Sequence, residues 1–267
     1  MKAYSPSHRK FLQKLRQNLF FTHFFRVLLL ILLFLIWEFV ANSGLVDPFI
    51  TSSPSRIFNA LIELFSSGNL VFHAWVTLYE TLLAFIISTL LGFVLAIVLY
   101  SIPPIRKVLE PYLVVLNSLP KVALGPLIIV WVGAGTKAII TMGILICIIV
   151  TTISILNGFL EVDEEKILLF KTMGASPIQI LFRLILPSSL PSLIAVLKIN
   201  VGLAWVGVIM GEYLNSSAGL GYLIVYGGQI FKLDLVMAAI LVLCLLASIM
   251  YFIIAGIEFI INKKRNK

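Results

Sequence analysis

Long apolar runs alternate with short polar connections along the whole chain. Three of them contain no charged residue: Leu82–Tyr100, Ala138–Leu156 and Leu235–Ile257. Each run is close to the roughly 20 residues that an α-helix needs to cross the hydrocarbon core of a membrane. Because lipid offers no hydrogen-bonding partner to the edge of an open sheet, these runs are predicted to be helices.

Three further runs complete a set of six predicted spans. They are Phe21–Leu45, Pro111–Val132 and Leu190–Gly211, and each contains one or two charged residues. The basic region before the core of the first run, Val27–Trp37, is more than twenty residues long, and no convincing small-x-small cleavage site follows it. This favours an uncleaved helix over a signal peptide. The fold is therefore predicted to be all-α and integral to the membrane, with residues 21–261 forming one domain of six transmembrane helices.

The composition agrees with a membrane protein. The chain is 60% hydrophobic and 12% charged, whereas about a quarter of the residues in a soluble domain are charged. A soluble enzyme, a disordered protein and a disulfide scaffold are therefore excluded. Cys147 and Cys244 lie inside apolar runs and are predicted to be free, buried thiols. The net charge of +8 comes mostly from residues between or beyond the runs, a pattern of membrane topology and not of nucleic-acid binding.

Lysine and arginine residues are divided unevenly between the two sides of the predicted membrane. Fifteen of the 20 fall on the side that holds the basic segment 1–20, the connection 158–190 and the basic tail 262–267. The other side receives three, which are Arg56, Lys137 and Lys232, and the remaining two lie within spans. Because cytoplasmic loops carry the excess of positive charge, both termini are predicted to be cytoplasmic.

Two connections are long enough to hold structure of their own. In the outer segment 42–73, apolar residues recur at helical spacing, and Ser55 is a plausible N-cap. We expect this helix to lie on the outer surface. The pattern is carried by Ile57, Phe58, Leu61, Leu64 and Phe65.

The cytoplasmic connection 158–190 predicts a helix-turn-helix. A first helix is expected over Asp163–Met173, a break at Gly174, a second helix from Ser176–Pro177, and a stop at Pro187. Gly174 can adopt the positive φ that ends a helix sharply. A structured cytoplasmic element on a membrane bundle suggests a docking partner, although the residues alone also fit an ordinary helix cap without one.

This segment resembles the cytoplasmic loop of ABC importer permeases, whose pattern is Glu-Ala-Ala, three residues, Gly, nine residues, Ile-x-Leu-Pro. The spacing from Gly174 to Leu186-Pro187 fits, while Leu184 replaces the isoleucine and Leu168-Leu169-Phe170 replaces Glu-Ala-Ala. The resemblance implies that an ATPase docks on eight residues of this loop: Leu168, Leu169, Phe170, Gly174, Ala175, Ser176, Leu186 and Pro187.

Further motifs over residues 43–240 resemble nitrate/sulfonate/taurine-type permeases. They include the run from Leu119-Pro120-Lys121 to Gly135, and Ala218-Gly-Leu-Gly221. The resemblance implies a multi-pass subunit of a bacterial inner membrane that receives a small solute from an extracytoplasmic binding protein. That solute would be an anion such as a sulfonate, nitrate or taurine, or a neutral vitamin precursor such as a pyrimidine or riboflavin. Two cytoplasmic ATPase chains would hold the ATP, a second identical permease subunit would complete the passage, and this chain would bind no cofactor.

Four ionisable residues and one tryptophan within the spans are candidates for the translocation pathway. A charge in hydrocarbon costs about 2.5–3.5 kcal/mol on insertion scales, so each charged group is expected to face a partner or water. The lysines would attract an anionic substrate, or they would pair with glutamates and hold helices together. The tryptophan would line the pathway or pack in the core. The five candidates are Glu80, Lys121, Lys198, Trp205 and Glu212.

Other function classes lack their usual signatures. The sequence contains no G-x-x-x-x-G-K-[ST] phosphate loop, no H-E-x-x-H and no G-x-S-x-G, and its histidines, His73 among them, have no evident partner. Neither a membrane enzyme nor a metal site is therefore expected. A stand-alone secondary transporter would show an internal repeat, and none is found. Stripes of small residues, Ser88-Gly92-Ala96 and Gly207-Gly211, predict close helix packing, either inside one subunit or at a dimer interface.

Overall fold

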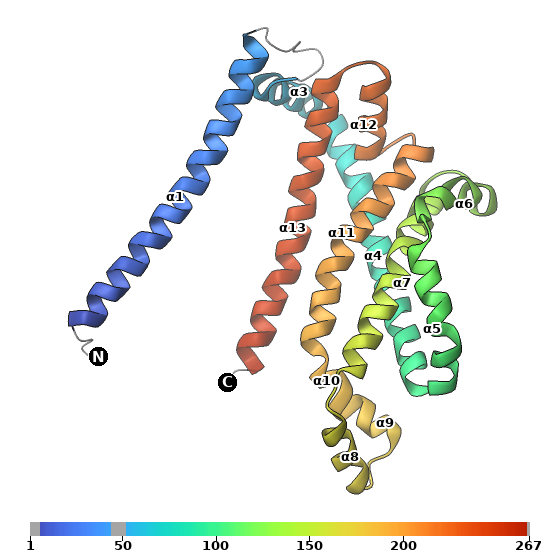
Figure 1. Ribbon diagram of the computed structural model, residues 1–267. Helices are drawn as coiled ribbons and strands as arrows, with labels where there is room; N and C mark the ends of the chain where they lie inside the picture. The colour runs from blue at the N-terminus through green and yellow to red at the C-terminus, as the bar shows by residue number, and fades with distance from the viewer. Residues whose placement is uncertain (1–5, 44–51, 266–267) are drawn as a thin grey trace.

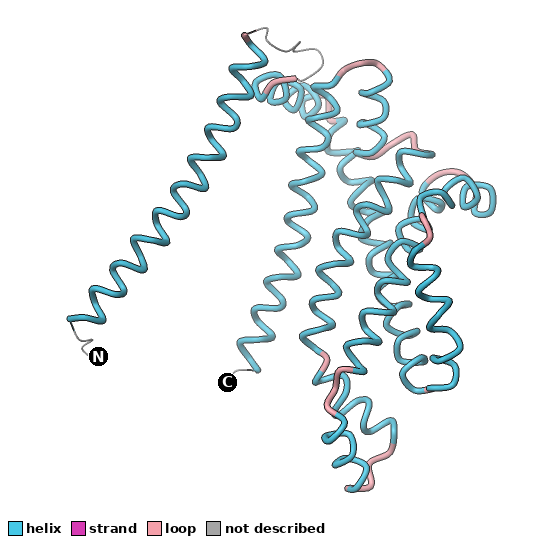
Figure 2. Tube along the Cα trace, viewed as in Figure 1, coloured by secondary structure: helices cyan, strands magenta, loops and turns pink. Residues whose placement is uncertain are grey.

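The computed structural model describes residues 6–43 and 52–265, and this part of the chain is helical apart from short turns (Figure 2). Five of its helices are long and apolar enough to cross a membrane. The prediction of an all-α membrane fold is confirmed at this level. The five helices are α1 (Pro6–Asn42), α4 (Asn69–Ser101), α7 (Thr136–Leu160), α11 (Leu190–Asn215) and α13 (Leu233–Arg265).

Helices α4, α7 and α11 form the centre of the bundle (Figure 1). Helix α5 (Pro103–Ser118) lies along one flank, while α12 (Leu220–Gln229) and α13 pack along the other. Cys147 on α7 is buried as predicted, but Cys244 on α13 is exposed because α13 packs against the bundle along one side only.

Small residues allow the central helices to approach closely. A Cβ atom added to Gly207 would lie 2.6 Å from the Cα atom of Gly143, and one added to Gly211 would lie 2.9 Å from the Cα atom of Ile139. A Cβ atom added to Gly92 on α4 would lie 2.6 Å from the side-chain methyl group of Thr151 on α7. The predicted stripes therefore pack inside one subunit, and the dimer-interface alternative is wrong for them.

Replacing Gly207 by Ala is expected to lower the thermal stability of the detergent-solubilised protein. The new methyl group overlaps the backbone of α7, and overpacking of this kind costs about 1–3 kcal/mol. Gly202→Ala is the matched control, because it lies on the same helix and its Cβ would meet nothing within 4 Å. Equal melting temperatures for the two variants would contradict the close approach of α7 and α11.

A buried amide links the three central helices. The side chain of Asn200 on α11 donates to Thr151 Oγ1 at 2.7 Å and to Thr89 Oγ1 at 3.2 Å. Thr151 donates in turn to the carbonyl of Cys147 at 2.8 Å. In a lipid environment such bonds between helices fix which faces meet, because an unpaired amide would have no water to bind.

The predicted span Pro111–Val132 is wrong as a straight helix. The chain instead forms α5, a short 3-10 turn (η1, Lys121–Leu124) and α6 (Gly125–Val132), and the two parts are bent by 87°. Leu119 precedes Pro120 and is extended, with ψ 138°, because the proline ring disfavours a helical conformation in the residue before it. Six spans result only if this bent pair is taken as one.

Helix α1 runs without a break through the predicted N-terminal segment and the first span, and it stands apart from the bundle (Figure 1). It contacts α3 (Pro54–Ser66) at its C-terminal end, where the Ser55 hydroxyl donates to Glu38 at 2.6 Å. Ser55 is therefore not the N-cap of α3. Ser53 fills that position and accepts from the backbone N–H of Arg56, because the helix begins two residues earlier than predicted, at Pro54.

Candidate functional site

The connection between α7 and α11 projects beyond the end of the bundle (Figure 1). It contains α8 (Glu164–Thr172), which is capped by the Asp163 side chain, and α9 (Pro177–Ile180). The predicted break at Gly174 is confirmed, with φ +78°. The N–H of Gly174 donates to Lys171 O and that of Ala175 donates to Phe170 O, both at 3.0 Å. These two bonds form a Schellman motif with Gly174 at the left-handed position.

The start of α9 is equally well defined. The backbone N–H of Gln179 donates to the Ser176 hydroxyl at 3.3 Å, and the backbone N–H of Ser176 donates to the Gln179 side chain at 2.8 Å. This reciprocal pair is a capping box, and Pro177 follows in the first turn with its φ already suited to a helix. The turn between α8 and α9 therefore holds one geometry.

The two faces of this helix-turn-helix differ sharply. Phe170 and Ala175 pack inward, against a core that includes Phe159, Ile180 and Ile185. Apolar side chains on the other face are exposed, by 57% to 76% of their surface. These exposed side chains are Leu168, Leu169, Met173, Ile178 and Phe182.

The second helix of the loop ends at Ser188, one residue after the predicted stop at Pro187. The chain continues through a π-helical turn (η2, Leu181–Ile185) and a short helix (α10, Leu186–Ser188). Pro187 is the second residue of α10, which follows the π-helical turn directly, and this is where a proline inside a helix is expected to disturb the regular hydrogen bonds. The break falls at Ser189, whose hydroxyl donates to Gly158 O on α7 at 2.8 Å and so ties α10 to the end of that helix.

The two candidate lysines lie in different settings. Lys198 on α11 forms an ion pair with Glu258 on α13, which is the glutamate-pairing alternative for this residue. Glu258 was not among the predicted residues. Lys121 lies in the bend between α5 and α6, and its Nζ donates to Asn117 O at 3.1 Å. Trp205 is 3% exposed and packs with Val201 and with residues of α13, so its indole is part of the core.

Glu80 and Glu212 are brought together where the start of α4 meets the end of α11, and each is 1% exposed. The Glu212 carboxylate accepts from the Thr77 hydroxyl at 2.6 Å and from the backbone N–H of Gly221 at 2.5 Å. The N–H of Leu220 donates to Thr77 Oγ1 at 2.7 Å. One carboxylate therefore holds the start of α12 against the central helices, where the positive end of the helix dipole favours a negative charge.

The contacts of Glu212 and Thr77 with the start of α12 form an anchor for that helix. Two glycines and a histidine also belong to it. A Cβ atom on Gly219 would collide with Glu212 Oε1, and one on Gly221 would lie 2.6 Å from Oε2. The Gly219 N–H donates to Nδ1 of His73 at 2.9 Å, so this histidine has a partner after all. The sequence pattern did not reveal these contacts, because His73 and Gly219 are 146 residues apart.

Lys198→Met is expected to weaken the contact between α11 and α13 by leaving the Glu258 carboxylate without its partner. Adding Glu258→Gln should restore assembly and uptake close to the wild-type level, since the charge of the pair is then removed as a unit. Thermal unfolding and solute uptake of both variants check this. A double variant that assembles normally and still fails to transport would instead support a direct role of Lys198 in binding an anion.

Comparison with known proteins agrees with the geometry. Residues 88–267 match the family of binding-protein-dependent transport system inner membrane components. A probable ABC transporter permease protein of Haemophilus influenzae is 33% identical, over 82% of this chain and 89% of that protein. The formylaminopyrimidine transport permease protein of Halalkalibacterium halodurans is 30% identical, over 90% and 95% respectively. The taurine transport system permease protein of Escherichia coli is 27% identical, over 83% and 82%.

The fold also matches a solved transporter. A chain of the MetNI methionine ABC transporter, in an inward-facing conformation, superposes with a TM-score of 0.64 over 72% of this chain and 95% of that chain, at 22% identity. The fold and the sequence comparisons together define a membrane subunit of an ABC importer. This chain belongs to the family of binding-protein-dependent transport system inner membrane components, and the predicted resemblance to importer permeases is confirmed.

Proposed function

We propose that this chain forms half of the membrane passage of an importer for a small organic or inorganic anion, driven by ATP hydrolysis on separate ATPase chains. The proposal that this chain couples transport to ATP hydrolysis rests on the exposed apolar face of α8 and α9. An apolar patch on a rigid element outside the bilayer is unfavourable unless a partner covers it. A groove on a cytoplasmic ATPase suits it, because a short helix held in one geometry transmits a rigid-body movement.

The distribution of charge supports a cytoplasmic position for this element. The same end of the bundle carries the start of α1 and the end of α13 (Figure 1). Helix α8 brings Lys166 and Lys171 to that end, η2 brings Arg183, and the start of α5 adds Arg106 and Lys107. The positive-inside rule then directs both termini to the cytoplasm and α3 to the outer face.

A second copy of the chain would complete the passage. One subunit offers a single α8–α9 element and leaves much apolar surface uncovered: α5 buries none of its residues, and Trp131 on α6 is 73% exposed. A C2 pair is the most common arrangement for such subunits and would present two docking elements to two ATPases. The isolated position of α1 also suits contact with a second bundle.

The names of relatives support two substrate classes. The taurine and aliphatic sulfonate permeases favour a small sulfonate, and Lys121 is a candidate contact because it forms no ion pair with any described residue. The formylaminopyrimidine permease, with its higher identity and coverage, favours a neutral precursor as the second candidate. A thermal-shift screen of the cognate binding protein distinguishes them. Stabilisation by sulfonates, taurine or nitrate supports the proposal, whereas stabilisation by pyrimidines or riboflavin alone contradicts the anion class.

A further inference from the structure

Two buried carboxyl groups, those of Glu80 on α4 and Glu212 on α11, contact each other through their side chains. Each residue is 1% exposed. Neither forms an ion pair with a lysine or arginine in the part of the chain that the structure describes. Two carboxyl groups in contact at a site without water or a cation cannot both be ionised, because the two negative charges repel each other.

The hydrogen-bond donors around Glu212 identify it as the ionised member of the pair. Both of its oxygens accept: Oε1 from the Thr77 hydroxyl at 2.6 Å, and Oε2 from the Gly221 N–H at 2.5 Å. A protonated carboxyl group would use one oxygen as a donor. Two accepting oxygens therefore fit a carboxylate.

Glu80 is the member that has a place for a proton. No N–H or O–H of a described residue donates to its buried Oε2 atom, and its side chain points into the anchor, against Glu212. A buried, ionised oxygen without a donor is unfavourable, because it loses its hydration and gains no hydrogen bond. With a proton on Glu80, its O–H donates to the Glu212 carboxylate and both groups are satisfied.

Other titratable groups on the surrounding helices supply no positive charge to the pair. His73 Nδ1 accepts from the Gly219 N–H at 2.9 Å, so the imidazole is neutral. Arg56 of α3 pairs with Asp234 of α13. The remaining groups are two phenols and one exposed lysine: Tyr213 of α11, Tyr222 of α12 and Lys137 of α7.

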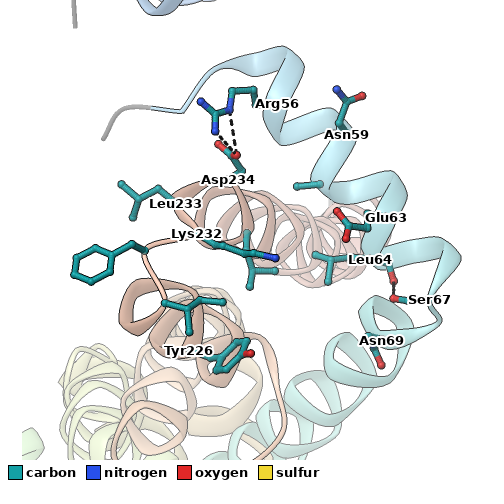
Figure 3. Close-up of a pocket in the computed structure, with 14 residues that line it drawn as sticks. Arg56, Asn59, Glu63, Leu64, Ser67, Asn69, Tyr226, Lys232, Leu233 and Asp234 are labelled. Atoms are coloured by element: carbon teal, nitrogen blue, oxygen red, sulfur yellow. Dashed lines mark hydrogen bonds and ion pairs between the residues drawn. The ribbon is translucent and has the colours of Figure 1, made fainter. Parts of the chain in front are cut away.

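Helix α12 has open space on one side. A cavity of about 570 Å³ lies between α3 and the turn that joins α12 to α13, and Tyr226 of α12 is on its wall (Figure 3). The helix therefore lacks packing there, and its position depends on its contacts with α13 and on the anchor at its start.

We infer that the Glu80–Glu212 pair is a binding site for a single proton, and that this proton keeps the start of α12 anchored to α4 and α11. Loss of the proton at alkaline pH would leave two negative charges in contact and weaken the anchor. The consequence for transport rests on the proposed function, in which α12 lies at the outer end of the passage. The proton then stabilises the closed arrangement of that end.

Infrared difference spectra of the purified transporter in nanodiscs detect the proton directly. The wild type should show the C=O band of a buried, protonated carboxyl group at neutral pH, and Glu80→Gln should remove it. Glu110→Gln is the matched control, because Glu110 is an exposed glutamate on α5. This control should leave the band unchanged.

The pH dependence of the melting temperature tests the role of the proton. The folded protein holds one more proton at this pair than the unfolded chain, so stability falls as pH rises from neutral to alkaline. Glu80→Gln should flatten this fall relative to the wild type and Glu110→Gln, because its amide donates to Glu212 at every pH. Glu212→Gln should lower the melting temperature already at neutral pH, since an amide nitrogen cannot accept from its donors. The ratio of alkaline to neutral uptake should be higher in Glu80→Gln than in the wild type.

An unchanged infrared band or an unchanged pH slope in Glu80→Gln would overturn the inference. A wild-type melting temperature that rises with Na⁺ at constant ionic strength, and does so less in Glu80→Gln, would overturn it too, because a metal cation would then occupy the pair. The proposed function fails in a different way. Absence of uptake by the wild type contradicts the importer role, whereas the infrared band and the melting temperatures still decide whether the pair holds a proton.

Discussion

Gly174→Val is expected to uncouple solute uptake from ATP hydrolysis while the permease still inserts and folds. The residue sits at φ +78° in the Schellman motif between α8 and α9, where a β-branched side chain is strongly disfavoured. A strain of about 1–3 kcal/mol would re-form the turn and move the exposed apolar face of the loop. The bundle lies elsewhere and should keep its melting temperature. Pull-down of the ATPase and substrate-stimulated hydrolysis in proteoliposomes measure the effect.

Gly174→Asn provides the control. A Cβ atom at this position meets nothing within 4 Å, so valine and asparagine differ in backbone preference and not in steric fit. Asparagine tolerates the left-handed region and should keep much of the coupling. Normal docking and coupling in Gly174→Val would show that this turn does not transmit the movement. Equal loss in both variants would point to the side chain itself and not to the turn geometry.

Glu212→Ala is expected to cause the largest loss of stability among single changes outside the packed glycines, together with loss of uptake. It removes the acceptor of the Thr77 hydroxyl and of the Gly221 N–H in a site that is 1% exposed. Each buried donor left without a partner costs about 1–3 kcal/mol. The start of α12 would then separate from α4 and α11. Thermal unfolding and uptake measure both effects.

A double-mutant cycle with Gly221→Ala tests whether the carboxylate is the cause. The added methyl group of Gly221→Ala would lie 2.6 Å from Glu212 Oε2, so the single variant should also be destabilised. In the Glu212→Ala background the collision with Oε2 is gone, while the contact with the Cβ atom of residue 212 at 2.8 Å stays, so the second change should cost less without becoming neutral. Additive losses would mean that the two residues act independently and that the anchor is not centred on Glu212.

Much of the fold follows from local patterns in the sequence. The apolar runs predict the long helices because each helix must satisfy its own backbone in lipid. Gly174 and Ser176 also act locally, so the Schellman motif and the capping box could be located from residue type and spacing. The bend at Pro120 was not predicted, because the apolar run continues on both sides of it. A proline after Leu119 nevertheless disfavours a continuous helix.

The candidate site was less predictable because its contacts join distant segments. Lys198 pairs with a glutamate 60 residues away, and Thr77 meets Glu212 across 135 residues. Periodicity carries no information about such partners. The sequence predicted that the buried charges need partners, and the structure supplies one for Lys198 and another for Glu212. Lys121 remains the candidate whose charge no described residue neutralises.

Uptake into proteoliposomes with controlled composition is the most direct measurement of the central claim. The purified chain is reconstituted with and without the ATPase that co-purifies with it, with the cognate binding protein outside and ATP available to the ATPase. The account predicts solute accumulation only when the ATPase, ATP and the binding protein are all present, and loss of accumulation with Gly174→Val. Accumulation by the chain alone, or accumulation that persists without ATP, would contradict it.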